Sequence, residues 1–329
     1  MSYLGRKLTD AHAKVCPYHD YLLVSEIVHL LASYSSYVTP SIKSNRENFI
    51  EGFDFSPLVR KRPIITLTTD YGLEDPYVAE VKAKILSIAR DAQIVDITHA
   101  IPSFDEKRGA FILLTATKHF PKGTIHVCVV DPKVGTERKG IIVVTKSGHT
   151  FVGPDTGLMW PAVSAAGIMS IYEIDELKIP PRTCETFHGR DVFAYVAAKL
   201  AIGVKPARLG KKIKHMMRVE YFEPTIEDYW LCAELMHIDK FGNIITNVSK
   251  ESLMLLGPIA EKYEVELCGR HYILPLCKTY GEVPVGSMLI LFGGTGFLEI
   301  AVNMGSAAEI IGAKVGERIR IRREQESPY

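Results

Sequence analysis

The chain has 329 residues, a formal net charge of +1 and a hydrophobic fraction of 47%. This length is sufficient for two domains that each bury a core of their own. A charge so close to neutral gives no reason to expect a nucleic acid or a membrane surface as partner. No uninterrupted apolar run is long enough to span a bilayer, so we expect an ordinary globular protein.

The cysteines give a first indication of the compartment. Six are scattered along the chain, and none forms a C-x-x-C pair. Several lie inside apolar runs, which favours buried free thiols in a reducing compartment. The first residues lack a basic region followed by an apolar core and a cleavage site of small residues. We therefore expect a cytoplasmic protein.

Residues 1–62 are predicted to form an N-terminal extension, in which residues 21–37 carry the apolar spacing of a helix. His12, Cys16 and His19 lie close together, but no fourth metal ligand follows at a recognisable spacing. We interpret these three as surface residues and assign no chemistry to the extension.

The main body begins at residue 63 with an alternation of strands and helices. Apolar, β-branched runs predict strands, and apolar residues at helical spacing predict helices between them. The expected strands cover residues 64–69, 93–98 and 124–130, and the expected helices cover residues 77–89 and 106–120. This alternation specifies an α/β domain at residues 63–215, with a mostly parallel sheet that helices cover on both faces.

The pattern changes along the rest of the chain. Further strands are expected at residues 141–145, 150–152 and 170–174, and a helix at residues 192–202. Short strands separated by glycine turns then follow at residues 230–238, 262–268, 288–292, 297–302 and 318–321. They predict a linker and a small all-β domain over residues 216–329, either a barrel or a sandwich.

Polar residues stand where the predicted strands of the α/β domain end. Asp70, His99 and Asp131 each follow a strand, and ligands gather at this edge of open α/β sheets. An acid in the position of Asp70 commonly accepts hydrogen bonds from a ribose diol. Helix capping is the other interpretation of Asp70, but Asp75, just before Pro76, occupies the better cap position.

His188 opens a predicted helix, whose positive end lowers the pKa of the imidazole and favours its neutral form. Together with Asp131 and Arg138 it can hold and polarise one water molecule, which suggests hydrolysis or nucleophilic substitution without a metal. Taken alone, Asp131 is compatible with a turn and His188 with a cap or core histidine. A metal site of Asp131, His188 and His99 has no supporting spacing.

The second domain offers weaker signals. Asn243 follows a strand and could bond in plane to an adenine or an amide, although an ordinary turn asparagine fits its spacing equally well. The segment Gly293–Gly296 resembles a phosphate-binding loop, but it enters a strand and lacks the lysine of a P-loop. Nucleoside triphosphates are therefore not expected.

Five segments, in this order, carry a family resemblance. They are Thr68–Gly72 (TTDYG), Val130–Arg138 (VDPKVGTER), Thr186–Asp191 (TFHGRD), Phe241–Asn243 (FGN) and Glu299–Gly305 (EIAVNMG). Together they resemble the S-adenosyl-L-methionine (SAM) hydroxide adenosyltransferases, the adenosine-forming branch of the superfamily that also holds the fluorinases and chlorinases. The resemblance runs from about residue 63 to residue 321 and omits the extension.

The resemblance implies an α/β domain followed by a β-barrel, assembled as a homotrimer with the substrate between the first domain of one subunit and the second domain of its neighbour. It implies that Asp131, Arg138 and His188 orient and activate water, and that Asp70 grips the ribose hydroxyls. The substrate-binding residues expected on this basis are Asp70, Asp75, Phe104, Asp239, Phe241, Asn243, Gly294, Asn303 and Met304. Phe104 packs on the ligand; Asn243, Asn303 and Met304 contact adenine; Asp239 and Gly294 lie near methionine.

Two departures from the family pattern bear on the reaction. Lys133 stands where the loop usually has glycine, which adds a charge close to the expected water site. The residues that bind halide in fluorinases fall at Asp131, Val134 and Gly189, where an acid repels an anion and no hydroxyl group is left. This favours water over halide as the nucleophile.

The resemblance therefore implies hydrolysis of SAM to adenosine and L-methionine by attack of water on C5′, with no cofactor and no metal. We expect activity to rise as His188 loses its proton. Three alternatives stay open: a SAM- or adenosine-binding protein without turnover, a chlorinase-like halide transferase, and an unrelated metal-dependent hydrolase.

Overall fold

The structure is a computed structural model that describes residues 62–219 and 223–324. The predicted extension, apart from Arg62, lies outside the described residues, and with it the helix expected at residues 21–37 and the group His12, Cys16 and His19. Within the described ranges, no helix is both long and apolar enough to cross a membrane.

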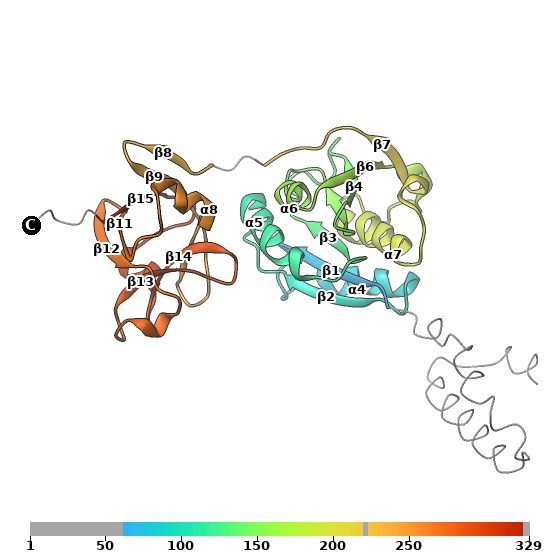
Figure 1. The fold of residues 1–329 in the computed structure, drawn as a ribbon. Coiled ribbons are helices and arrows are strands. Elements are labelled where there is room, and N and C mark those ends of the chain that lie inside the picture. The colour runs from blue at the N-terminus through green and yellow to red at the C-terminus, as the bar shows by residue number, and fades with distance from the viewer. Residues whose placement is uncertain (1–61, 220–222, 325–329) are drawn as a thin grey trace, which may run out of the picture. The chain divides into compact units, whose positions relative to one another are not determined.

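The first domain is built on a seven-stranded sheet (Figure 1). In spatial order the strands are β2 (Gln93–Thr98), β1 (Ile64–Thr69), β3 (Ile125–Val129), β5 (Thr150–Pro154), β4 (Gly140–Thr145), β6 (Ile168–Ile174) and β7 (Gly210–Ile213). The pairings from β2 through β5 are parallel, and those from β5 through β7 are antiparallel. The sheet is thus mixed, and its parallel half contains the strands that precede Asp70 and Asp131.

Helices cover both faces of this sheet. They are α4 (Tyr77–Ile88), α5 (Glu106–Ala116), α6 (Trp160–Ala165) and α7 (Tyr195–Ala201), with the short turns η5 (Thr117–His119), η6 (Glu176–Lys178), η7 (Gly189–Ala194) and η8 (Pro206–Arg208). The core on one face joins α4, η7 and α7 to the sheet, and the core on the other joins α5 and α6. Neighbouring strand residues such as Ile141 and Ile142 point into opposite cores, as the alternation of a strand requires.

The start of α4 differs from the expectation. Asp75 was predicted to cap this helix, but the cap position is taken by Pro76, and no side chain bonds to the first turn. Helix α5 does have a side-chain cap, because Asp105 accepts a hydrogen bond from the Arg108 backbone N–H. The assignment of Asp75 as a cap was therefore wrong.

The second domain is an antiparallel sheet that nearly closes on itself. Its strands run in the order β12 (Arg270–Pro275), β11 (Lys262–Leu267), β15 (Arg318–Arg323), β9 (Trp230–Ile238), β10 (Ile244–Ser249), β14 (Phe297–Val302) and β13 (Met288–Phe292), and β8 (Thr225–Glu227) pairs with β9. A bridge between Leu276 and Ile290 joins the two ends of this order. Short helices complete the domain: α8 (Lys250–Leu253), η9 (Met254–Leu256), η10 (Tyr280–Glu282) and α9 (Ala307–Ile311). The predicted class, an α/β domain followed by a small β-barrel, is confirmed.

The described cysteines are all free thiols, but they are not all buried. Cys128, Cys232 and Cys277 are buried, as expected, whereas Cys268 is exposed and Cys184 is partly exposed. The expectation of buried thiols therefore holds for three of the five described cysteines.

A buried histidine lies in the middle of the first sheet. His126 in β3 is fully buried, and its Nδ1 atom is 2.8 Å from Thr66 Oγ1. Its Nε2 atom is 3.3 Å from His149 Nδ1, and its ring packs on Phe151. Burial, and then the neighbouring His149, lower the pKa of His126 to about 3. This side chain is therefore neutral at physiological pH.

This pKa predicts a pH-dependent stability. An unfolded histidine has a pKa of about 6.5, so the stabilising effect of neutral His126 is complete above that pH and decreases as pH falls toward 3. In urea unfolding at pH 7 and pH 5, the difference in free energy of unfolding between wild type and His126→Gln should shrink as the pH is lowered, by up to about 1.4 kcal/mol per pH unit. Exposed His119→Gln is the control, and an undiminished difference for His126→Gln would contradict the assignment.

Candidate active site

A cavity of about 720 Å³ opens at the edge of the sheet where the parallel strands end. Five of the predicted site residues line it: Asp70, Asp75, Phe104, Asp131 and His188. A second hollow, of about 830 Å³, lies on the barrel among residues such as Tyr229 and Leu255 and contains no predicted site residue. Because ligands bind at the carboxyl ends of parallel strands, we take the first cavity as the candidate active site.

Asp70 follows β1 and is held by the segment that carries Phe104. The Phe104 backbone N–H donates a hydrogen bond of 3.0 Å to Asp70 Oδ2, and Phe104 has a φ of 66°. A non-glycine residue in this left-handed region is uncommon and often marks a functional loop. The phenylalanine ring is 64% exposed. Asp70 and Phe104 are therefore neighbours at the cavity, as two groups that bind one ligand must be.

His99 connects the ends of two strands. Its Nδ1 atom is 2.8 Å from Thr69 Oγ1, its Nε2 atom is 3.1 Å from Asp96 Oδ1, and its backbone carbonyl accepts a bond from the Gly72 N–H. The side chain is buried and does not line the cavity. His99 thus holds the loop after Asp70 in place.

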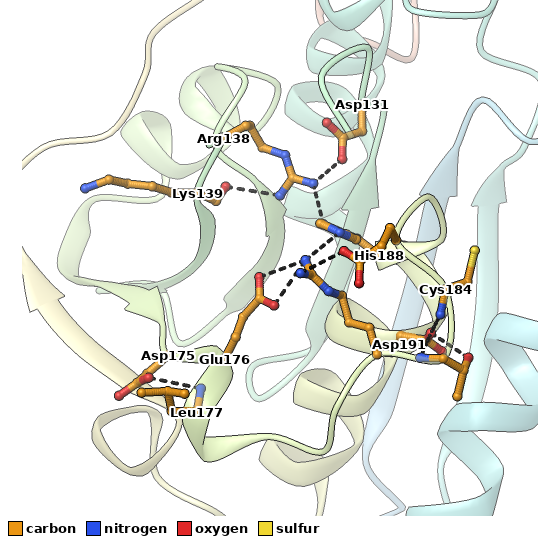
Figure 2. A network of polar contacts seen from close by, with 12 residues as sticks. Asp131, Arg138, Lys139, Asp175, Glu176, Leu177, Cys184, His188 and Asp191 are labelled. Atoms are coloured by element: carbon orange, nitrogen blue, oxygen red, sulfur yellow. Dashed lines mark hydrogen bonds and ion pairs between the residues drawn. The ribbon is translucent and has the colours of Figure 1, made fainter. Parts of the chain in front are cut away.

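Asp131, Arg138 and His188 form one connected group, which Figure 2 shows from close by. Arg138 Nη2 donates to Asp131 Oδ2 over 2.5 Å and lies 2.9 Å from His188 Nδ1. Arg138 Nη1 donates to the Lys139 carbonyl, and the guanidinium lies over the Phe193 ring. The side chains of Arg138 and Asp131 are only 4% and 7% exposed. Arg138 thus joins Asp131, from its own loop, to His188, which lies 50 residues further along the chain.

The second oxygen of Asp131 is the feature of this group that points to chemistry. Oδ1 is buried and has no hydrogen-bond partner, and the residue lines the cavity. Burial raises the pKa of the Asp131 carboxyl, while the charge and hydrogen bond of Arg138 oppose this shift. A buried acceptor without a partner costs free energy, so this oxygen is suited to a proton-bearing ligand such as water.

The pKa of His188 is lowered, as predicted, but for another reason. The histidine precedes η7, a six-residue π-helical turn that continues into α7. Burial is the largest cause of the lowered pKa, followed by the charges of Arg138 and Arg182. The imidazole is 3% exposed. Such single π-turns frequently occur at functional sites.

Sequence reasoning missed Arg182 and Tyr71. Arg182 Nη1 lies 2.8 Å from His188 Nε2, so the imidazole has an arginine at each ring nitrogen. The Tyr71 hydroxyl oxygen lies against Gly189, only 2.2 Å from where a Cβ on that glycine would be. Arg182 stands in a loop without periodicity, and no sequence signal reveals it. For Tyr71, the glycine at position 189 was a signal, because a residue without a side chain lets another group pack closely against its backbone.

The predicted residues of the barrel do not line this cavity. Asp239 Oδ2 accepts a hydrogen bond of 2.9 Å from Asn243 Nδ2, and Asn303 Nδ2 donates to the Val283 carbonyl. Phe241 and Met304 are 67% and 86% exposed, and Gly294 lies in the turn between β13 and β14. Lys133 in the first domain is also exposed and outside the cavity lining.

The described ranges contain no group of three or more histidine, cysteine, aspartate or glutamate side chains that could hold a metal ion. The fold and the cavity define a two-domain protein with a small-molecule site at the strand ends of its α/β domain. Family models of the SAM hydroxide adenosyltransferase N-terminal and C-terminal domains match residues 65–210 and 233–320. The chain belongs to this family.

Curated relatives are similar over most of the chain. A protein of Methanocaldococcus jannaschii named (R)-S-adenosyl-L-methionine hydrolase is 37% identical over 268 residues, 78% of this chain and 95% of the relative. A Thermus thermophilus protein of the same name is 37% identical, over 79% of this chain and 99% of the relative. A fluorinase of Nocardia brasiliensis is more distant, at 27% identity over 80% of this chain and 97% of the relative.

Solved structures agree with the fold. The crystal structure of an uncharacterized conserved protein from Thermotoga maritima is 34% identical, with a TM-score of 0.76 over 79% of this chain and 100% of that chain. A conserved hypothetical protein from Thermus thermophilus is 37% identical, with a TM-score of 0.63 over 79% of this chain and 99% of that chain.

The contact between Gly189 and Tyr71 yields a prediction. In Gly189→Ala the new methyl group meets the Tyr71 hydroxyl, so the variant should lose about 1–3 kcal/mol of stability, as overpacked cores do. Gly281→Ala is the control, because a Cβ there meets nothing within 4 Å. Adding Tyr71→Phe removes the opposing oxygen and should restore part of the loss. Urea unfolding of the wild type and these three variants would contradict this contact if Gly189→Ala lost no more stability than Gly281→Ala.

Proposed function

We propose that this protein hydrolyses SAM to adenosine and L-methionine by attack of water on C5′. The proposal is supported by the family membership and by the relatives named (R)-S-adenosyl-L-methionine hydrolase, which are 35–37% identical over at least 78% of the chain. Their name also supports the R epimer at sulfur as the substrate. The unpartnered Oδ1 atom of Asp131 is the structural observation on which the mechanism rests.

The reaction needs placement of water more than it needs a strong base. C5′ is bonded to a sulfonium, and the leaving group is a neutral thioether, so the C–S bond is already polarised for displacement. Holding the water in line behind C5′ removes much of the entropic barrier. An acceptor must take one water proton so that a lone pair of the oxygen faces the carbon. Asp131 Oδ1 supplies that acceptor at the wall of the cavity.

Arg138 and His188 support this acceptor. Arg138 fixes Asp131 through Oδ2, which leaves Oδ1 for water. His188 Nδ1 accepts the other proton of the same Arg138 nitrogen and so fixes the orientation of the guanidinium. Both ring nitrogens of His188 face arginines, so Asp131 is the better placed of the two predicted proton acceptors.

Asp70 and Phe104 are suited to the nucleoside part of the substrate. The Asp70 carboxylate is held at the cavity through Oδ2 and can accept hydrogen bonds from the ribose hydroxyls. Phe104 offers an exposed ring beside it, on which a purine or ribose can pack. The carboxylate of Asp131 disfavours a halide ion in the water position by charge repulsion.

We further propose that the site is completed by the barrel of a neighbouring subunit in a homotrimer. The adenine and methionine contacts are expected from Asp239, Phe241, Asn243, Gly294, Asn303 and Met304, none of which lines the cavity. The large exposure of the apolar side chains Phe241 and Met304 favours their burial against another surface. The free thiols favour a reducing compartment, the cytoplasm.

The direct test is product analysis. Incubated with (R)-SAM in water enriched in oxygen-18, the protein should release adenosine and methionine in equal amounts, and the label should appear in the 5′ hydroxyl group of adenosine. Added chloride or fluoride should yield no halogenated nucleoside. Retention of intact SAM without products would indicate a binding protein, and a halide-dependent product would indicate a halide transferase; either result would overturn the proposal.

Asp131 gives the sharpest mutational test. Asp131→Asn keeps the shape of the side chain but removes the carboxylate acceptor, so kcat should fall by about 100-fold or more, while the Kd for SAM changes only a few-fold. Glu137→Gln, at an exposed position of the same loop, is the control and should retain wild-type turnover. Undiminished kcat in Asp131→Asn would remove Asp131 from the mechanism.

A further inference from the structure

Two arginine donors face the His188 ring, which has at most one acceptor nitrogen. Arg138 Nη2 lies 2.9 Å from Nδ1, and Arg182 Nη1 lies 2.8 Å from Nε2. A guanidinium has only donors, and a neutral imidazole has only one acceptor nitrogen, because the other carries a proton. An imidazolium has no acceptor. The two arginines can therefore not both donate to His188 at one time, and neither can donate once the ring is charged.

The two arginines are held very differently. Arg138 is 4% exposed, is bonded to Asp131 and to the Lys139 carbonyl, and lies over Phe193. Arg182 is 26% exposed and pairs with Glu176 at 3.1 Å and Glu185 at 2.9 Å. Arg182 can give up its bond to Nε2 and keep two carboxylate partners. Arg138 would lose a bond at a nearly buried position, where an unsatisfied donor costs more free energy.

The loop that carries Arg182 is fixed beside the histidine. Asp191 Oδ2 accepts hydrogen bonds from the backbone N–H groups of Thr183 and Cys184 and from the Thr183 hydroxyl. Figure 2 shows Glu176 on the side of His188 opposite Asp131. Even when Arg182 does not donate to Nε2, its charge therefore stays next to the imidazole.

We propose that Arg182 is a positioning residue that acts through His188: its charge keeps the imidazole neutral, so that Nδ1 stays an acceptor for Arg138. With the proton on Nε2, Arg138 bridges His188 and Asp131, and Arg182 directs its donors to Glu176 and Glu185. The role in turnover rests on the proposed function, whereas the effect on the protonation of His188 does not.

Four charged groups act on this imidazole. Arg138 and Arg182 oppose its protonation, and Glu176 and Asp131 favour it. Removing Arg182 leaves Glu176 without its cation beside the ring, so both changes act in the same direction. The pKa of His188, which burial and the two arginines hold below its ordinary value, should therefore rise.

The first measurement needs no turnover. In NMR titrations of histidine-labelled protein, with His188 assigned by its loss in His188→Gln, Arg182→Met should raise the pKa of His188 by about one unit or more. Arg182→Lys keeps a cation there and should stay closer to wild type. Exposed Arg208→Met, which changes a distant charge on η8, should leave the pKa unchanged. Equal pKa values in wild type and Arg182→Met would overturn the proposal.

The second measurement is the pH profile of kcat with SAM. A raised pKa moves the acid limb of the profile to higher pH by the same shift, while the plateau at alkaline pH stays within about twofold of wild type. A merely structural role would lower kcat at all pH values, and that result would overturn the proposal. Arg182→Gln replaces Arg182→Met should the latter fail to fold. If SAM is not hydrolysed at all, the proposed function fails, and the NMR result still decides the role of Arg182.

Discussion

The arrangement of the site depends on a single nitrogen atom, Nη2 of Arg138. Its two protons are directed at Asp131 Oδ2 and at His188 Nδ1, and the two side chains of the ion pair are almost removed from water. A lysine could not replace it, because an ammonium is a point charge without the planar fork of a guanidinium. By occupying one oxygen of Asp131, this nitrogen determines that the other oxygen is the one left for a ligand.

The fold can hold these groups because each comes from the end of a well-packed element. Asp131 follows β3, His188 precedes η7, and the loop between β3 and β4 carries Arg138. Two separate cores lie on the two faces of the sheet and fix its strands. A buried acid is stable as an anion only beside a fixed positive charge. In Asp131, burial raises the pKa of the carboxyl group and Arg138 lowers it.

Much of this could be predicted from the sequence. The bounds of β1, β2, β9, β13 and β14 match the expected ranges, because β-branched and apolar runs between turn formers leave little freedom. The sequence also contains a signal for the antiparallel half of the first sheet. The four residues between β4 and β5 are too few for a parallel crossover, so these two strands must pair antiparallel. The role of Arg182 could not be predicted from the sequence, because its position beside His188 depends on the loop that Asp191 anchors.

The hairpin of β4 and β5 also shows that the two ends of the strands differ in what they carry. Strand β4 begins at the edge that carries Arg138 and ends at the opposite edge, where it turns through Ser147 and Gly148 into β5. Gly148 has a φ of 92° and is exposed. Backbone hydrogen bonds tie this turn to two neighbouring loops, from Ser147 to Ala166 and from Gly123 to Gly148, so an insertion here would break them without touching the cavity. The residues that face the ligand and the turn that anchors the sheet to its neighbouring loops thus lie at different ends of one strand.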